Sequence, residues 1–219
     1  AWTPGKIYDA NGVQNAARLR QLGFAVNRRH CSDDPEEIAR EMRELLAECD
    51  AVITSGGVSV GQKDYLPAVL EQLNADILFA GVAQKPGSPM LAGKVGGKLV
   101  FCLSGNPFAA AATLEQYAVP ALLRAAGRCE ESCLLPRTAR TLTTGFSKPS
   151  KGNRYLRAKI FTKPSQIPQI LNKICCFYPK KTAPPVDFGP NLCIMIYRRI
   201  RICISFHRPF AVSLSLIHI

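Results

Sequence analysis

The chain has 219 residues, of which 47% are hydrophobic and 20% charged, and its formal net charge is +12. A chain of this length can bury one hydrophobic core, or one domain and part of another. The composition excludes a disordered chain, and no apolar run is long enough to cross a bilayer. Nine cysteines without zinc-type or disulfide-framework spacing favour a reduced, cytoplasmic protein.

Two helices are predicted near the start of the chain. Apolar residues at helical spacing predict the first over residues 13–22, with Asp9 or Asn11 as its cap. The second begins at Asp34, because an aspartate cap, a proline at the first helical position and a glutamate three residues after the cap form a capping box. Asp33 is not needed for this cap and lies between a strand and a helix, where ligands of open α/β sheets bind.

A glycine-rich segment, TSGGVSVGQKDY at 54–65, follows a buried strand at 51–53 and precedes a helical pattern at 65–73. Glycines and serines at a strand-to-helix junction turn several N–H groups toward an anion, and the N-terminus of the following helix favours negative charge. Lys63 adds a cation, and Asp64 adds a carboxylate suited to holding a metal or positioning a water. A plain glycine turn is the alternative, but this concentration of serines and charges favours a phosphate-bearing ligand.

A second junction of the same kind follows the clearest strand of the chain, at 98–103. It has the sequence Ser-Gly-Asn-Pro at 104–107, in which Asn106 caps a long helix and Pro107 occupies its first turn. Pro120 is expected to kink or break that helix. Two such junctions on one sheet place two helix N-termini at the same edge, which predicts an anionic ligand between them.

Between the two junctions, an apolar run at 77–79 predicts another strand, and a loop at 82–90 is made rigid by two prolines and a glycine. Lys85 is the only charge in this loop and, taken alone, is a surface residue. The alternation of strands and helices predicts an α/β fold with a parallel sheet flanked by helices.

Three segments of different composition are expected. The α/β domain covers residues 1–127, residues 128–160 begin a small β domain, and residues 161–219 form an atypical tail. The tail holds 8 of the 28 Lys and Arg residues but only 1 of the 16 Asp and Glu residues, and 7 of the 16 prolines. A shifted reading frame produces such a composition, and the last six residues look like a translated sequencing adapter, so we expect no selected function there. Basic charge would also suit nucleic-acid contact, but no aromatic stacking platform supports it.

Residues 4–160 resemble the molybdopterin molybdenumtransferase family, which includes the E domain of gephyrin. Six segments in order carry the resemblance: PGKIYDAN (4–11), DDPEEI (33–38), TSGGVSVGQKDY (54–65), QKPGSP (84–89), LSGNP (103–107) and SKGNRYLRA (150–158).

The resemblance implies Mg²⁺-dependent insertion of molybdate into adenylylated molybdopterin with release of AMP, by a cytoplasmic homodimer that binds neither nucleic acid nor membrane. It implies Asp64, Asp33 and Lys85 as catalytic residues, with the two aspartates as metal ligands, and Arg157 near the oxyanion. It also implies a set of cofactor-binding residues at the two junctions and the intervening loop: Ser55, Gly56, Gly57, Ser59, Gly61, Ser88, Ser104, Gly105, Asn106 and Pro107.

The chain also departs from the family pattern. Ser88 stands where members usually carry a second lysine, and Ser104 replaces the first proline of their second turn. Family members have a further strand and catalytic acid before the position of Ala1, so we expect an N-terminally truncated domain with Val52 and Val100 partly uncovered. Such a chain would be poorly folded or inactive alone. Two alternatives are a molybdopterin adenylyltransferase of the same fold and a non-catalytic module that holds molybdopterin-AMP.

Overall fold

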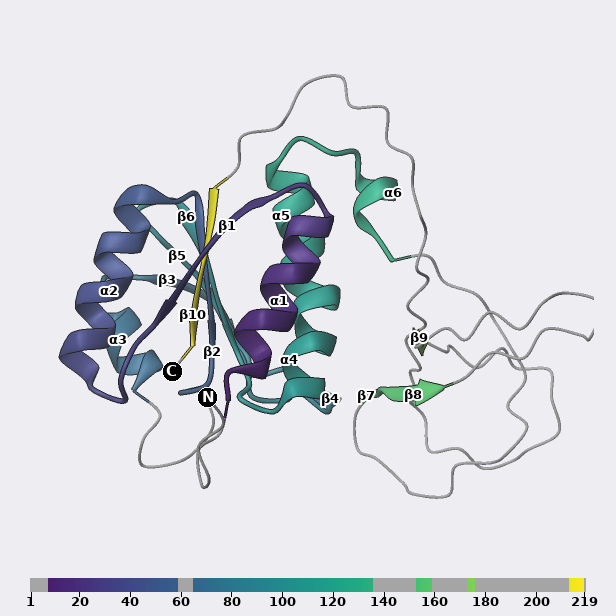
Figure 1. Ribbon diagram of the computed structural model, residues 1–219, viewed down its shortest axis with the longest axis horizontal. Helices are drawn as coiled ribbons and strands as arrows, with labels where there is room; N and C mark the ends of the chain where they lie inside the picture. Colours follow the sequence, from purple (N-terminus) through teal and green to yellow (C-terminus); the bar gives the residue numbers. More distant parts are fainter. Residues whose placement is uncertain (1–7, 59–64, 136–152, 159–172, 176–212, 219) are drawn as a thin grey trace, which may run out of the picture.

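The computed structural model describes residues 8–58, 65–135, 153–158, 173–175 and 213–218. Its main body has three layers, with one sheet between two groups of helices (Figure 1). The helices are α1 (Ala10–Gln21), α2 (Pro35–Glu48), α3 (Leu66–Gln72), α4 (Pro107–Thr113), the π-helical segment η1 (Leu114–Ala118), α5 (Val119–Ala125) and α6 (Glu130–Cys133). The strands are β1 (Ala25–His30), β2 (Ala51–Ser55), β3 (Asp76–Ala80), β4 (Gln84–Lys85), β5 (Leu91–Val95), β6 (Lys98–Leu103), β7 (Asn153–Arg154), β8 (Leu156–Ala158), β9 (Lys173–Cys175) and β10 (Ser213–His218).

The sheet has the strand order β1-β10-β2-β6-β5-β3. The first four strands are parallel, and β5 runs antiparallel to both of its neighbours. The predicted α/β fold is therefore confirmed, although β5 was not predicted. Its hairpin with β6 turns at Gly96 and Gly97, whose φ angles of 56° and 81° are those of a two-residue type I′ turn.

Strand β10 comes from the segment that the sequence analysis treats as a tail. It lies between β1 and β2 and pairs in parallel with both (Figure 1). The expectation that Val52 and Val100 are partly uncovered is wrong, because both are 0% exposed. Their side chains belong to the hydrophobic cluster that packs under α2 and α3, so their burial comes from the helices that cover this face of the sheet.

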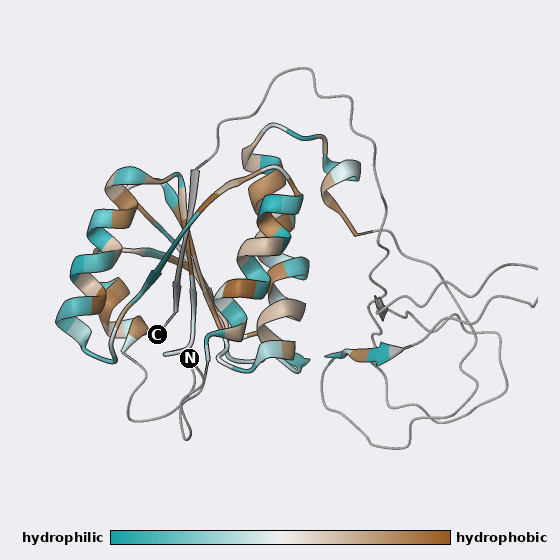
Figure 2. Cartoon of the chain, in the orientation of Figure 1, coloured by the Kyte–Doolittle hydropathy of each residue, from teal (hydrophilic) through white to brown (hydrophobic). Residues whose placement is uncertain are grey.

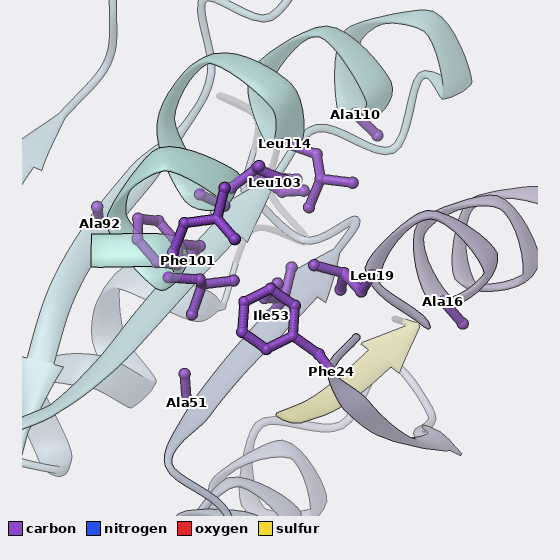
Figure 3. Close-up of a cluster of buried hydrophobic side chains, with 14 of the residues drawn as sticks. Ala16, Leu19, Phe24, Ala51, Ile53, Ala92, Phe101, Leu103, Ala110 and Leu114 are labelled. Atoms are coloured by element: carbon purple, nitrogen blue, oxygen red, sulfur yellow. The ribbon is translucent and has the colours of Figure 1, made fainter. Parts of the chain in front are cut away.

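Two hydrophobic cores hold the layers together. The first lies between the sheet and helices α1, α4 and α5, where Leu19, Ile53, Phe101 and Leu114 converge (Figure 3). The second lies under α2 and α3 on the opposite face. Hydrophilic residues occupy the outer sides of the helices (Figure 2), which is the amphipathic pattern from which α1 and α2 were predicted.

Local signals set the helix starts. Asp34 accepts a hydrogen bond from the Glu37 N–H at 2.8 Å, as its capping box predicts. Asp9 caps α1 by accepting from the Gly12 N–H at 2.6 Å, and its second oxygen pairs with Arg28 of β1 at 2.9 Å. Asp9 therefore fixes the first turn of α1 against the neighbouring strand.

The predicted break at Pro120 takes the form of a π-helical segment. Proline has no N–H and its ring displaces the carbonyl four residues earlier, so regular α-helical bonding cannot continue through it. The helix changes to wider π-helical bonding just before Pro120, where the Val119 N–H donates to the Leu114 carbonyl five residues earlier. Of the helices that the structure describes, none has the length and apolar character needed to span a membrane.

Candidate anion-binding edge

Two glycine corners lie side by side at one edge of the sheet. We call residues 55–57 the first corner and residues 104–107 the second corner. Strands β2 and β6 are parallel, and their register pairs Ser55 with Leu103, so both corners leave the sheet at the same level. The Gly56 N–H donates to the Leu103 carbonyl at 3.0 Å, and a methyl group on Gly105 would lie 3.6 Å from the Gly56 Cα. The predicted convergence of the two junctions on one edge is confirmed.

The first corner depends on left-handed backbone. Gly56 and Gly57 have φ angles of 102° and 64°, in the region that side chains disfavour. Ser55, which precedes them, is 2% exposed at the end of β2. Two successive glycines in this conformation let the chain turn sharply away from the sheet and bring main-chain N–H groups close to an approaching anion.

The second corner is held from both sides. Asn106 accepts from the Ala109 N–H at 3.0 Å and Pro107 occupies the first turn of α4, as predicted. The Asn106 N–H lies 3.3 Å from the Ser104 hydroxyl oxygen. The Asn11 side-chain N–H donates to the Gly105 carbonyl at 2.8 Å. This contact was not predicted, because the sequence around Asn11 indicated only a helix cap.

The loop that carries Lys85 packs on the helix that starts at the second corner. Gln84 is 4% exposed and accepts a hydrogen bond from the Tyr117 hydroxyl at 2.8 Å. Gly87 lies against Thr113 and the Ala109 carbonyl of α4. Lys85 itself is exposed, as is Ser88. The buried Gln84 therefore anchors the loop, while the side chain of Lys85 remains in solvent.

A segment far along the chain joins this loop. The Asn153 N–H donates to the Ala83 carbonyl at 3.0 Å, and the Tyr155 N–H donates to the Lys85 carbonyl at 2.8 Å, which pairs β7 with β4. The Arg157 guanidinium lies 4.8 Å from the centre of the Phe108 ring, one residue beyond the second corner. A second cation thus stands beside that corner, where the family resemblance places basic residues.

The structure does not test the predicted pairing of Asp33 and Asp64 as metal ligands, because only Asp33 lies in the described ranges. Asp33 is exposed in the loop after β1, and two strand spacings, about 10 Å, separate β1 from β2. Asp64, Ser59 and Gly61 lie outside the described ranges. Within those ranges no group of three or more His, Cys, Asp or Glu side chains is suited to hold a metal ion.

Two thiols near this edge of the sheet are protonated at neutral pH. Burial raises the pKa of Cys102, which immediately precedes Leu103 on β6, to about 12. Burial, with the neighbouring Glu37 carboxylate, raises the pKa of Cys31 to about 11. Neither thiol suits a nucleophilic role, because the thiolate is the reactive form.

A labelling experiment checks this assignment. Cys129 is exposed, and a hydrogen bond with Ser132 lowers its pKa, so it holds more thiolate at any given pH than the two buried thiols. Iodoacetamide at pH 8 is expected to label Cys129 before Cys31 and Cys102, as read by peptide mass spectrometry. Labelling of Cys102 in the folded chain at the rate of Cys129 would contradict the burial of that thiol.

Comparison with known proteins identifies the family. A family model described as "probable molybdopterin binding domain" matches residues 2–124. The chain belongs to this molybdopterin-binding domain family. The molybdopterin molybdenumtransferase of Staphylococcus epidermidis is 40% identical over 157 residues, which cover 71% of this chain and 37% of that protein. The enzyme of the same name from Staphylococcus aureus (strain COL) is 37% identical over the same coverage.

Among solved structures, the molybdopterin biosynthesis MoeA protein of Pyrococcus horikosii is similar to this chain, with 32% identity and a TM-score of 0.49, and the match covers 58% of this chain and 32% of that one. The sequence matches confirm the resemblance to molybdopterin molybdenumtransferases. The chain spans about 37% of the length of the curated relatives that it matches.

Proposed function

We propose that the chain acts in molybdenum cofactor biosynthesis by binding adenylylated molybdopterin where its two glycine corners meet. The observation that carries this proposal is the contact between the corners, in which the Gly56 N–H bonds to Leu103 and Gly105 approaches the Gly56 Cα. Two strand-to-helix turns of a molybdopterin-binding domain then face the same space. A ligand with several phosphate oxygens can accept hydrogen bonds from both turns at once.

The proposed reaction is insertion of molybdate into the bound molybdopterin with release of AMP. Breaking the phosphoanhydride places negative charge on the leaving phosphate oxygens, and fixed N–H donors and cations stabilise that charge without reorganising. We assign this role to Lys85, which lies in the loop that packs on α4, and to Arg157, which contacts the Phe108 ring one residue beyond the second corner. Serines 55, 88 and 104 would hold further ligand oxygens.

The proposal includes a requirement for Mg²⁺, a homodimer and a cytoplasmic location, which the resemblance to molybdopterin molybdenumtransferases implies. Asp64 and Asp33 are the carboxylates proposed for the metal. The Mg²⁺ requirement rests on the family resemblance and is tested directly in the assay below.

A second candidate is binding of molybdopterin-AMP without turnover. One observation favours it: Ser88, in the loop that carries Lys85, supplies no second cation. Loss of one positive charge next to a dianionic substrate weakens stabilisation of the developing charge more than it weakens ground-state binding. The same corners would then hold the ligand without releasing AMP.

The experiment is an AMP-release assay on the full chain with adenylylated molybdopterin, with molybdate and Mg²⁺ each present or omitted. The proposal expects AMP only when both are present, and less AMP from the Lys85→Ala variant. Bound nucleotide with no AMP released indicates the binding module. Turnover that instead needs ATP and unmodified molybdopterin indicates an adenylyltransferase of the same fold, and it overturns the proposal.

A further inference from the structure

Asn11 joins two parts of the chain that lie 94 residues apart in sequence. It is the second residue of α1, is 4% exposed, and donates from its side-chain nitrogen to the Gly105 carbonyl at 2.8 Å. The helical turn that carries it is capped by the Asp9 carboxylate, which accepts from the Gly12 N–H at 2.6 Å. The second corner is therefore attached to the capped first turn of α1.

This hydrogen bond sets the direction of a donor. In a trans peptide the C=O and the following N–H point in opposite directions. Holding the Gly105 carbonyl toward α1 turns the Asn106 N–H away from α1. That N–H lies 3.3 Å from the Ser104 hydroxyl oxygen, a long hydrogen bond that a charged phosphate or molybdate oxygen would replace with a shorter one.

The polar surroundings of Asn11 are incomplete in a second way. Among the residues that the structure describes, its side-chain oxygen has no hydrogen-bond partner, although Asn11 is only 4% exposed. Buried amide groups are almost always paired in folded proteins, with protein, water or ligand. The unpaired oxygen of Asn11, whose side-chain nitrogen contacts the second corner, is therefore a polar group that a bound molecule can satisfy.

We propose that Asn11 is a positioning residue that aims the Asn106 N–H at a tetrahedral oxyanion, either a phosphate of the nucleotide-bearing ligand or molybdate. This inference rests on the proposed function. Asn11 acts through the main chain of the second corner, so its loss should weaken oxyanion binding while leaving the domain folded.

The test compares Asn11→Ala with Asn15→Ala in the full chain. Both residues are buried on the same helix, but only Asn11 contacts Gly105. Calorimetric titration with AMP and, separately, with molybdate should show affinity reduced about tenfold in Asn11→Ala, the loss expected for one hydrogen bond to a charged group, and nearly unchanged in Asn15→Ala. Weakening with AMP alone assigns the oxyanion to a phosphate, and weakening with molybdate alone assigns it to molybdate.

Two further readouts separate positioning from a general structural role. The amide resonance of Asn106 should move on AMP addition in the unsubstituted chain and not in Asn11→Ala, while the two variants melt at similar temperatures. If Asn11→Ala does not fold, Asn11→Asp keeps the shape but replaces the donor with an acceptor, and it should lose affinity to at least the same degree. Wild-type affinity in the Asn11 variants, or equal losses at Asn11 and Asn15, overturns the inference. Failure of the unsubstituted chain to bind either probe overturns the proposed function itself, and the inference with it.

Discussion

Replacing Arg18 with methionine is expected to lower the free energy of unfolding by about 3–5 kcal/mol, the usual result of leaving one partner of a buried ion pair uncompensated. The Glu115 side chain is 0% exposed, and Arg18 reaches it from α1 with two hydrogen bonds, from Nε and from Nη2. Without Arg18, the chain must bury an unpaired carboxylate or lose the packing of η1 against α1. Denaturant unfolding at pH 7 measures the loss.

The matched control is Arg124→Met. Arg124 pairs with Glu130 at 2.9 Å, but both side chains are largely in solvent, at 65% and 72% exposure. Such surface pairs contribute little, so this variant should unfold nearly as the parent does. The double variant Arg18→Met/Glu115→Leu should recover much of the stability that Arg18→Met loses, because it removes the buried charge. Equal losses in Arg18→Met and Arg124→Met would show that burial of Glu115 does not determine the effect.

Replacing Gly87 with alanine is expected to cost about 2–4 kcal/mol, from left-handed backbone strain and an overpacked contact together. Gly87 has a φ of 93°, and an added Cβ would lie 2.6 Å from the Thr113 Cγ2. The loop that carries Lys85 would have to move away from α4, so stability and ligand affinity should fall together. Denaturant unfolding and AMP titration of the same sample check both.

Gly97→Ala is the control for the cost of left-handed backbone strain alone. Gly97 has a similar φ of 81° but has nothing within 4 Å of an added Cβ, so its cost should be limited to about 1–2 kcal/mol of strain. The substitution Thr113→Ser removes the colliding methyl and keeps the hydroxyl that bonds to the Ala109 carbonyl at 2.9 Å. Combined with Gly87→Ala, it should restore part of the lost stability, as a double-mutant cycle reports. If the two substitutions add with no coupling, the contact with Thr113 is not the cause.

Elements with local signals could be predicted from the sequence. Asp34 and Asn106, each followed by proline, fixed two helix starts because capping is decided within a few residues. The β5 hairpin also has a local signal in Gly96-Gly97, although it was not predicted.

Long-range pairing could not be predicted in the same way. Strand β10 pairs with β1 and β2 through the parallel main-chain ladder, so the alternation of Ser213–His218 suits a strand but does not say where it pairs. The position between β1 and β2 is therefore occupied by residues 213–218, whose composition gave no reason to expect a place in the sheet. Val52 and Val100 were expected to be partly exposed because a neighbouring strand was missing. Their burial depends instead on the helices that cover their face of the sheet.

The candidate site likewise has features that could be predicted from local sequence and features that depend on long-range contacts. Convergence of the two corners follows from parallel strands, whose carboxyl ends share an edge, and it was predicted. The contact between Asn11 and Gly105 and the pairing of β4 with β7 join residues too distant for any local pattern to reveal. The roles given to Asp33, Lys85 and the corner residues remain predictions from the family.

The most direct test of the shared edge is an amide NMR titration of the full chain with AMP. We expect the resonances of both corners, Ser55 to Gly57 and Ser104 to Asn106, to shift together and to saturate with a single dissociation constant. Shifts confined to one corner, or centred on the Gly96-Gly97 hairpin at the opposite edge of the sheet, would contradict it.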